Sequence, residues 1–258
     1  METMTGPNGG GRLRGKVAVI TGGGRGIGGA TARAFAQEGA RVVIGDIGQA
    51  EAEDTVSAIE STGGEAVLVT TDVTREEDCV RLMRQAAARF GRIDVLVTCA
   101  GIFRGGLVPV EEFDEAEFQA VLDVNLLGTF RAVKHAVPVM RRGGGGVVIL
   151  IASGAGVRGP SGSLAYGASK GGVHGLALTL EARLAPHGIR VHDVCPGNLD
   201  TVLKREAEAE IRRRSGRDAA ERVVPSSSRL GDPAGVAALL TLLASDASRY
   251  LRGTLFTR

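Results

Sequence analysis

The stretch VAVITGGGRGIG, residues 17–28, decides the fold of this chain. VAVIT (17–21) is a short β-branched apolar run, which is typical of a buried strand. The glycines after it force a sharp turn, and the sequence then follows a helical pattern through Gln37. A helix that begins directly after such a turn presents free backbone N–H groups and the positive end of its dipole. The stretch therefore predicts a strand, a phosphate-binding loop and a helix in succession.

The same alternation of apolar runs and helical patterns continues along the chain. Helical patterns run through about Ile59 and Phe90, and over 115–139 and 163–185. Apolar strands separated by helices indicate a parallel sheet that is covered on both faces. We therefore predict an α/β, doubly wound Rossmann fold with a central parallel sheet of about seven strands. The further apolar runs are 41–46, 66–72, 93–100, 147–153 and 189–196.

The chain shows no domain boundary and no internal repeat. We predict a flexible N-terminal segment, 1–13, followed by one catalytic domain, 14–258. Aromatic residues make up only 3% of the chain, so the core must be built from Val, Leu, Ile and Ala. One region, 199–228, is charged and ends in the turn-like sequence PSSS. It could form a short helical insertion over the ligand side of the sheet.

The composition excludes several classes of protein. A net charge of +2 is too small to indicate a nucleic-acid partner. No apolar run approaches the roughly 20 residues of a membrane span, and the N-terminus lacks the apolar core of a secretory signal. Three scattered cysteines fit a reducing compartment, and the four histidines share no metal-like spacing. We expect a cytoplasmic protein with no membrane partner and no bound metal.

The glycine loop TGGGRGIG (21–28) has the context that dinucleotide binding requires, since a strand precedes it and a helix follows it. Gly22 and Gly26 would let the backbone approach a pyrophosphate, and Gly28 would allow close packing of the helix on the sheet. A tight turn without a ligand is the alternative, and the flanking elements disfavour it.

The predicted second strand ends at Asp46, about 20 residues after the glycines. A carboxylate there can accept hydrogen bonds from the adenosine ribose and repels a 2′-phosphate, which favours NAD over NADP. Arg25 argues for NADP, because a guanidinium in the loop could bind that phosphate. We rank Asp46 higher; its alternative role is a strand-end turn residue. Asp72, after the third strand, could bind the adenine amino group or serve equally well as a turn or N-cap residue.

SLAYGASK, residues 163–170, places Tyr166 one helical turn before Lys170. Free tyrosine has a pKa near 10, too high for a base at neutral pH. A cation on the same helical face should stabilise tyrosinate and depress this pKa. Ser153 ends the fifth apolar run, where its hydroxyl could bind a substrate carbonyl or alcohol oxygen. The three residues predict an acid/base pair with an orienting hydroxyl, suited to a proton that moves together with a hydride.

Taken together, these motifs resemble the short-chain dehydrogenase/reductase family, in its single-domain branch, over nearly the whole chain from Lys16. YGASK resembles the YxxxK motif of the family, and Ser153 stands where its catalytic serine does. Asn125, in LDVNLLG, matches its helix asparagine. PGNLDT (196–201) is similar to the segment that surrounds the nicotinamide, and 229–248 resembles the C-terminal helix region.

The resemblance implies an NAD(P)-dependent oxidoreductase of secondary alcohols or ketones, including 3-oxoacyl groups. It implies that Tyr166 is the acid/base, that Lys170 lowers the tyrosine pKa and binds the nicotinamide ribose, and that Ser153 holds the substrate oxygen. Asn125 would support a water-linked proton relay with the lysine. A homodimer or tetramer through the helices 115–139 and 163–185 is also implied. The cofactor-binding positions would be Gly22, Arg25, Gly26, Ile27, Gly28, Asp46, Ile47, Asp72, Val73, Ala100, Gly101, Tyr166, Lys170, Pro196, Gly197, Leu199 and Thr201.

Three departures from the family pattern stand out. TCAG (98–101) replaces NNAG, so Thr98 stands where an asparagine ties strands together, and Cys99 is either redox-sensitive or, as we favour, a small buried filler. The sequence ends LRGTLFTR, whereas many members of the family end in a longer glycine-rich tail. That tail contributes to tetramer contacts and to the substrate pocket in those members. The run Arg212–Arg214 is read as a solvated helix face in preference to a site for an acidic or carrier-bound substrate.

The sequence therefore predicts an NAD(H)-dependent oxidoreductase that acts on a small-molecule alcohol or ketone. One alternative is an NADPH-dependent ketoreductase of the 3-oxoacyl or polyketide type. Others are a non-redox enzyme that uses the same tyrosine and a binding-only protein, which the TCAG sequence and the unusual C-terminus favour. The intact set of serine, tyrosine, lysine and asparagine favours an enzyme.

Overall fold

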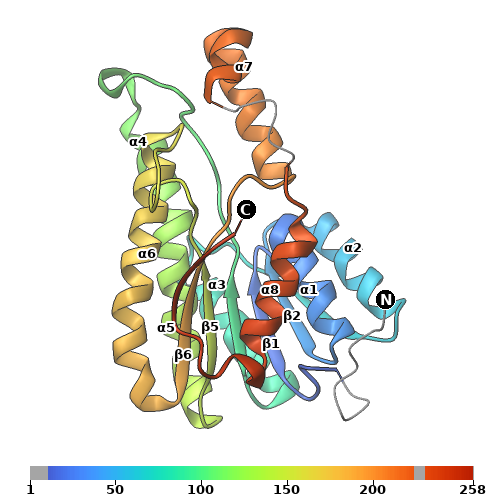
Figure 1. Ribbon diagram of the computed structural model, residues 1–258. Coiled ribbons are helices and arrows are strands. Elements are labelled where there is room, and N and C mark those ends of the chain that lie inside the picture. The colour runs from blue at the N-terminus through green and yellow to red at the C-terminus, as the bar shows by residue number, and fades with distance from the viewer. Residues whose placement is uncertain (1–10, 224–229, 258) are drawn as a thin grey trace.

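The computed structural model of the protein describes residues 11–223 and 230–257. Seven parallel strands form one sheet in the order β3-β2-β1-β4-β5-β6-β7 (Figure 1). The strand order reverses between β1 and β4, which is where doubly wound folds bind ligands. The predicted fold is confirmed. The strands are β1 Val17–Thr21, β2 Arg41–Asp46, β3 Glu65–Thr70, β4 Val95–Thr98, β5 Gly146–Ile151, β6 Ile189–Cys195 and β7 Gly253–Phe256.

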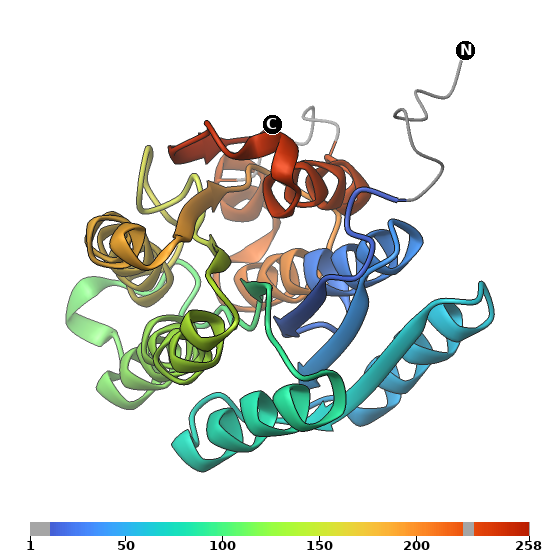
Figure 2. The same cartoon turned by 90° about the horizontal axis from the view of Figure 1, so that it is seen from below.

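Helices cover both faces of the sheet, and Figure 2 shows α1 and α8 on the side opposite α5 and α6. Each face buries its own aliphatic core, one around Ile20, Phe35 and Leu240 and the other around Leu96 and Met140. The first core is covered by α1 (Gly26–Gln37), α2 (Gln49–Glu60) and α8 (Pro233–Ala244), the second by α3 (Glu76–Phe90), α5 (Gly128–Arg142) and α6 (Leu164–Leu184).

The chain differs from the sequence prediction in the middle and at both ends. The single helix expected over 115–139 is α4 (Glu115–Leu122), a π-helical turn (Asp123–Leu127) and α5. The C-terminal tail forms β7, which pairs with β6 and brings Gly253 opposite His192. Leu13, expected at the end of a flexible segment, is fully buried. The first ten residues of that segment, 1–10, lie outside the described residues.

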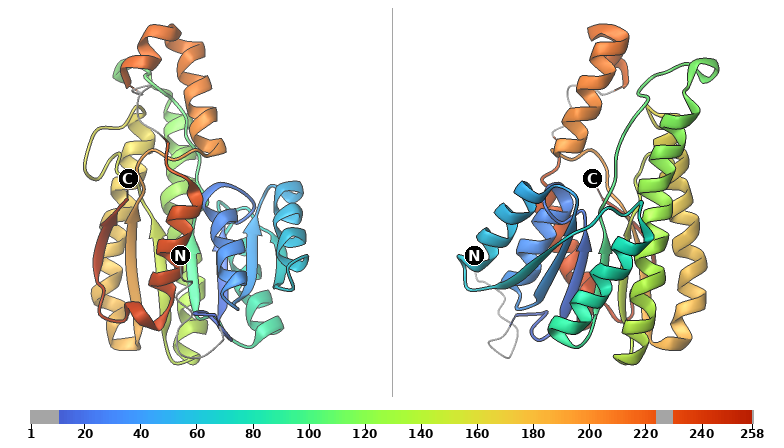
Figure 3. Two further views of the ribbon diagram at one scale, coloured as in Figure 1. Left: turned by 45° about the vertical axis from the view of Figure 1, so that its right-hand side comes forward. Right: turned by 180° about the vertical axis from the view of Figure 1, so that it is seen from behind.

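The region 199–228 contains the long helix α7 (Val202–Val223), which stands on the carboxyl-edge side of the sheet (Figures 1 and 3). A helical insertion there agrees with the sequence, although it is longer than expected. The PSSS segment of this region lies outside the described residues. Within 11–223 and 230–257, every helix is too short or too polar to span a bilayer.

Candidate active site

Two adjoining cavities lie at the carboxyl edge of the sheet. The larger, about 520 Å³, is lined by the glycine loop and the ends of β2 and β4. The smaller, about 190 Å³, surrounds Tyr166. They share wall residues that include Ile27, Cys99, Ile151 and Thr201, so the two cavities lie next to each other.

The structure gathers the predicted cofactor-binding and catalytic residues into these two cavities, apart from Asn125. The larger contains Gly22, Arg25, Gly26, Ile27, Gly28, Asp46, Ile47, Asp72, Val73, Ala100, Gly101 and Thr201. The smaller contains Ser153, Tyr166, Lys170, Pro196, Gly197, Leu199 and again Ile27, Gly101 and Thr201.

The glycine loop forms a cradle that side chains would fill. A Cβ at Gly28 would lie 2.0 Å from the Gly22 carbonyl oxygen, and a Cβ at Gly22 would lie 2.6 Å from the Ala100 nitrogen. Gly26 begins α1 in the left-handed region at φ 57°, and the N-cap residue of this helix, Arg25, makes no side-chain capping bond. Uncapped N–H groups beside a bare backbone suit a pyrophosphate. The residues present therefore fit a dinucleotide.

Asp46 ends β2, lines the larger cavity and accepts hydrogen bonds from two backbone segments that border it. Its Oδ2 accepts a hydrogen bond from Gly24 N at 2.8 Å and its Oδ1 from Gly48 N at 2.9 Å. The carboxylate keeps free lone pairs, since each oxygen can accept more than one bond. Asp46 therefore has the strand-end turn role that was its alternative. Its remaining lone pairs can still accept hydrogen bonds from ribose hydroxyls.

Arg25 and Asp72 both line this cavity, and both already have partners. The Arg25 guanidinium lies 3.3 Å from Glu206 of α7. Asp72 Oδ1 accepts bonds from the Thr74 nitrogen at 2.9 Å and the Thr74 hydroxyl at 2.7 Å, which is a local turn. The N-cap of α3 is Arg75, so Asp72 is a turn residue and not the cap.

Tyr166 is positioned by the start of α6. The Ser163 hydroxyl accepts a bond from Tyr166 N at 3.2 Å and donates to the Arg104 carbonyl at 2.6 Å. The tyrosine ring packs on Phe103 with 5.4 Å between ring centroids. Lys170 Nζ lies 5.7 Å from the centroid of the tyrosine ring and donates to the Ile151 carbonyl at 2.7 Å. Helix α6 thus presents the phenol and the ammonium to the same cavity.

Burial controls the protonation of both groups. It raises the pKa of the Tyr166 phenol, and hydrogen bonding with the Ser153 hydroxyl offsets this in part. It also lowers the pKa of Lys170 to about 8. The predicted depression of the tyrosine pKa by Lys170 is wrong for this arrangement, because removing the phenol from water has the larger effect.

Asn125 lies behind the cavities, fully buried on the π-helical turn. Its Oδ1 accepts a bond from Ile102 N at 2.8 Å, and its Nδ2 donates to the Ile102 carbonyl and the Ser169 hydroxyl, both at 3.0 Å. The side chain therefore ties this turn to the segment after β4 and to α6. Through Ser169 it fixes the part of α6 that carries Lys170.

The two residues that depart from the family pattern differ in their surroundings. The Thr98 hydroxyl is buried and has no hydrogen-bond partner in the described part of the chain, so it does not tie strands together. Cys99 lines both cavities, and burial raises the pKa of its thiol to about 12. A thiol that stays protonated is poorly reactive, which supports the role of a small filler.

The smaller cavity also includes residues that the sequence did not single out. Phe103 comes from the segment after β4, Asn198 follows β6, and Leu203, Lys204 and Ala207 come from α7. The helical spacing of the last three could have indicated a common face. The run Arg212–Arg214 is exposed, and Arg214 pairs with Glu210 at 3.3 Å and Glu117 at 3.5 Å, as a solvated face would.

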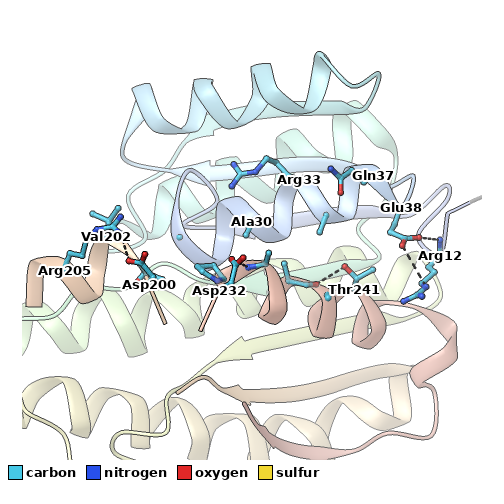
Figure 4. Close-up of a pocket in the computed structure, with 17 residues that line it drawn as sticks. Arg12, Ala30, Arg33, Gln37, Glu38, Asp200, Val202, Arg205, Asp232 and Thr241 are labelled. Atoms are coloured by element: carbon cyan, nitrogen blue, oxygen red, sulfur yellow. Dashed lines mark hydrogen bonds and ion pairs between the residues drawn. The ribbon is translucent and has the colours of Figure 1, made fainter. Parts of the chain in front are cut away.

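A third cavity, about 620 Å³, lies between α1 and α8 (Figure 4). Two ion pairs lie in its wall: Arg12 Nε is 4.0 Å from Glu38 Oε1, and Arg205 pairs with Asp200. Ser153, Tyr166 and Lys170 are not among its lining residues. The reactive groups are therefore confined to the two cavities at the sheet edge.

Comparison with known proteins places the chain in a family. The family model described as short chain dehydrogenase matches residues 16–212. Cis-4-hydroxycyclohexanecarboxylate dehydrogenase of Sinomonas cyclohexanicum is 39% identical over 93% of this chain and 93% of its own. L-fucose dehydrogenase of Bos taurus is 38% identical over 94% of this chain and 87% of its own. The crystal structure of levodione reductase superposes with a TM-score of 0.88 at 32% identity, covering 95% of this chain and 96% of its own.

The chain belongs to the short-chain dehydrogenase/reductase family. Its relatives are named dehydrogenases and reductases, so it is an oxidoreductase that acts on CH–OH groups. A nicotinamide cofactor follows from the family.

Proposed function

We propose that the protein is an NAD(H)-dependent dehydrogenase that interconverts a secondary alcohol and a ketone, with Tyr166 as the acid/base. One observation carries the proposal. Ser153, Tyr166 and Lys170 line a single cavity, and this cavity shares a wall with a glycine cradle that ends at Asp46. A hydroxyl, a phenol and an ammonium beside a dinucleotide cradle are the groups needed to move a proton while a hydride is transferred.

The preference for NAD rests on the charges around the cradle. Asp46 places a carboxylate at the end of β2, fixed by two backbone amides, where it would repel a 2′-phosphate. The cation that could offset it, Arg25, is paired with Glu206. The contact with Glu206 neutralises part of the charge that would favour a 2′-phosphate.

The chain's own residues would handle the proton. In the oxidation, the Tyr166 phenolate takes the hydroxyl proton of the alcohol, and the oxygen electron pair forms the carbonyl while the C–H bond breaks. The bound nicotinamide supplies the hydride acceptor in this direction and the hydride donor in the other. Ser153 would hold the substrate oxygen in place. Burial disfavours the phenolate, and the charge of Lys170, fixed by the Ile151 carbonyl, would offset only part of that effect.

The dimensions of the cavity support a small substrate. Its volume of about 190 Å³ lies below the roughly 300–1,000 Å³ of cavities that hold drug-sized ligands. Two relatives are named for a hydroxycyclohexanecarboxylate and for L-fucose, which are compact ring alcohols. We infer that the substrate of this protein is of similar size.

A test is to incubate the purified protein with NAD or NADP and a panel of ring alcohols, following NADH absorbance and ketone formation together. The expected result is one NADH formed per ketone, with NAD preferred. Consumption of substrate without any change in NADH would point to a non-redox reaction. Failure to bind either dinucleotide would contradict the proposal altogether.

We also propose that the protein assembles as a dimer or tetramer through α5 and α6. Apolar side chains on these helices face solvent in the single chain: Phe130 is 43% exposed and Leu178 is 52% exposed. Burying them against a second copy would remove that surface from water. A sedimentation mass equal to one chain would contradict this assembly.

A further inference from the structure

Lys204 of α7 is the second cation in the cavity that holds Tyr166. The other is Lys170, and no Asp or Glu is found among the described residues that line this cavity. Much of the remaining wall is apolar, with Phe103, Leu203 and Ala207 near the α7 side. A cationic and largely apolar cavity disfavours a cationic ligand and attracts an anion.

The two lysines are not equivalent. The Lys170 ammonium donates to the Ile151 carbonyl at 2.7 Å and lies beside the tyrosine ring. The Lys204 ammonium lies 3.3 Å from Asn198 Oδ1 and 3.7 Å from Glu208 Oε1. Charge-assisted bonds are typically about 2.7–2.9 Å, so both contacts are loose. An ammonium has three donors, and Lys204 therefore keeps the capacity to bind an anion.

Helix α7 is held over the cavity from two sides. Glu206 pairs with Arg25 of the glycine loop at 3.3 Å. Glu210 Oε1 accepts bonds from the backbone nitrogens of Gly105 at 2.8 Å and Gly106 at 3.2 Å. Lys204 lies at the start of the same helix, and its backbone N donates to the Thr201 hydroxyl at 3.2 Å. Its stem is fixed at the cavity, and only 21% of its side chain is exposed.

We propose that Lys204 binds a carboxylate of the substrate, so that the substrate class is a small hydroxy acid and the corresponding keto acid. This inference rests on the proposed dehydrogenase function and adds the charged group that the substrate carries. The alcohol carbon lies at Ser153 and Tyr166, and the carboxylate lies across the cavity at α7. The apolar wall between them accommodates a carbon ring or a short chain. Glu208, the carboxylate nearest to this ammonium at 3.7 Å, is not among the residues that line the cavity.

The test compares an acid with a neutral alcohol of similar shape, 4-hydroxycyclohexanecarboxylate and 4-methylcyclohexanol, each oxidised with NAD. The variant Lys204→Met keeps the stem and removes the charge, and Lys204→Arg restores a cation. Arg213→Met removes an exposed cation from the same helix as a matched control. A second readout is calorimetric binding of cyclohexanecarboxylate to the protein loaded with NADH, which needs no turnover.

Wild type is expected to prefer the acid, and Lys204→Met is expected to raise its KM by about 10- to 100-fold, the range of a hydrogen bond to a charged group. The same variant should lower kcat/KM for the neutral alcohol far less than for the acid, because the neutral alcohol has no carboxylate to lose. Lys204→Arg should recover most of the acid affinity, and Arg213→Met should change neither substrate. Binding of cyclohexanecarboxylate should weaken in Lys204→Met alone.

Three results would overturn the inference. Equal loss on the acid and the neutral alcohol would show that Lys204 only positions α7. Undiminished binding of cyclohexanecarboxylate in Lys204→Met would show that the carboxylate site lies elsewhere. A wild-type preference for the neutral alcohol would remove the anionic substrate while leaving the dehydrogenase function intact. If wild type oxidises neither alcohol yet binds the carboxylate through Lys204, it is the proposed function that fails.

Discussion

The two cavities at the sheet edge are built in opposite ways. The cofactor cradle takes its centre from one continuous stretch, 21–28, and from the ends of neighbouring strands. The substrate cavity is closed by segments that are far apart in sequence, including Phe103, Ser161 and Lys204. A site made from adjacent residues can be recognised as a motif, whereas a site assembled by packing is visible only in three dimensions.

The forces that hold the two cavities differ as well. Backbone bonds fix the cradle, since Gly22 N donates to the Gly45 carbonyl at 2.7 Å and Cys99 N to the Thr21 carbonyl at 2.9 Å. Helix α7 is anchored mainly by side chains, and the Arg25–Glu206 pair is about half exposed on both partners. Exposed ion pairs contribute little stability, about 0–1 kcal/mol. We therefore expect the cradle to be rigid and specific, and the substrate side to open more easily.

Among the variants that compare how the two cavities are held, Gly28→Ala should have the largest effect. The new Cβ would lie 2.0 Å from the Gly22 carbonyl oxygen, so the loop must move away from its anion-binding shape. We expect the Kd for NADH, followed by fluorescence titration, to rise at least about tenfold.

Gly235→Ala on α8 is the matched control, because a Cβ there meets nothing within 4 Å. It should leave NADH binding unchanged, and it could stabilise the helix by about 0.5–1 kcal/mol. Equal NADH binding by Gly28→Ala and wild type would show that the cradle is not the cofactor site.

Asp46→Asn should have the next largest effect. The amide oxygen can still accept one of the bonds from Gly24 and Gly48, while the negative charge is lost. The ratio of NADPH to NADH dissociation constants should fall by about tenfold or more, since like-charge repulsion of a 2′-phosphate disappears. An unchanged ratio in this variant would mean that Asp46 is only a turn residue.

Glu210→Gln tests the substrate side. The neutral amide accepts more weakly from Gly105 and Gly106, so α7 should open more often. We expect a severalfold higher KM for the alcohol and an NADH Kd within about twofold of wild type. If the KM for the alcohol and the Kd for NADH rise by the same factor, the two cavities are not held by independent contacts.

Thr98→Val should have the smallest effect. The Thr98 hydroxyl is buried without a partner among the described residues, while the backbone of β4 is paired on both sides. Replacing an unpaired hydroxyl by a methyl should change the free energy of unfolding by less than about 1 kcal/mol or raise it. A larger loss in urea denaturation would reveal a bonding partner for this hydroxyl.

The same contrast decides what the sequence could predict. Six strands follow from β-branched apolar runs such as 17–21, and the loop and strand ends predict positions that the fold brings together in the larger cavity. β7 has no such run, because Gly253–Phe256 is short and only half covered. The π-helical turn was hidden within a continuous helical pattern, and the roles of Lys204 and Glu210 depend on where α7 docks. The raised pKa of Tyr166 depends on burial, which spacing alone does not give.

The most direct test of the central claim is a pair of measurements on Tyr166→Phe: the rate of alcohol oxidation with NAD and the Kd for NADH. The variant loses one hydroxyl and keeps the ring that packs on Phe103. We predict that kcat falls by about 10²–10⁴-fold, as expected for loss of a general acid/base, while the Kd changes by less than about twofold. Turnover at the wild-type rate would contradict the assignment of Tyr166 as the acid/base.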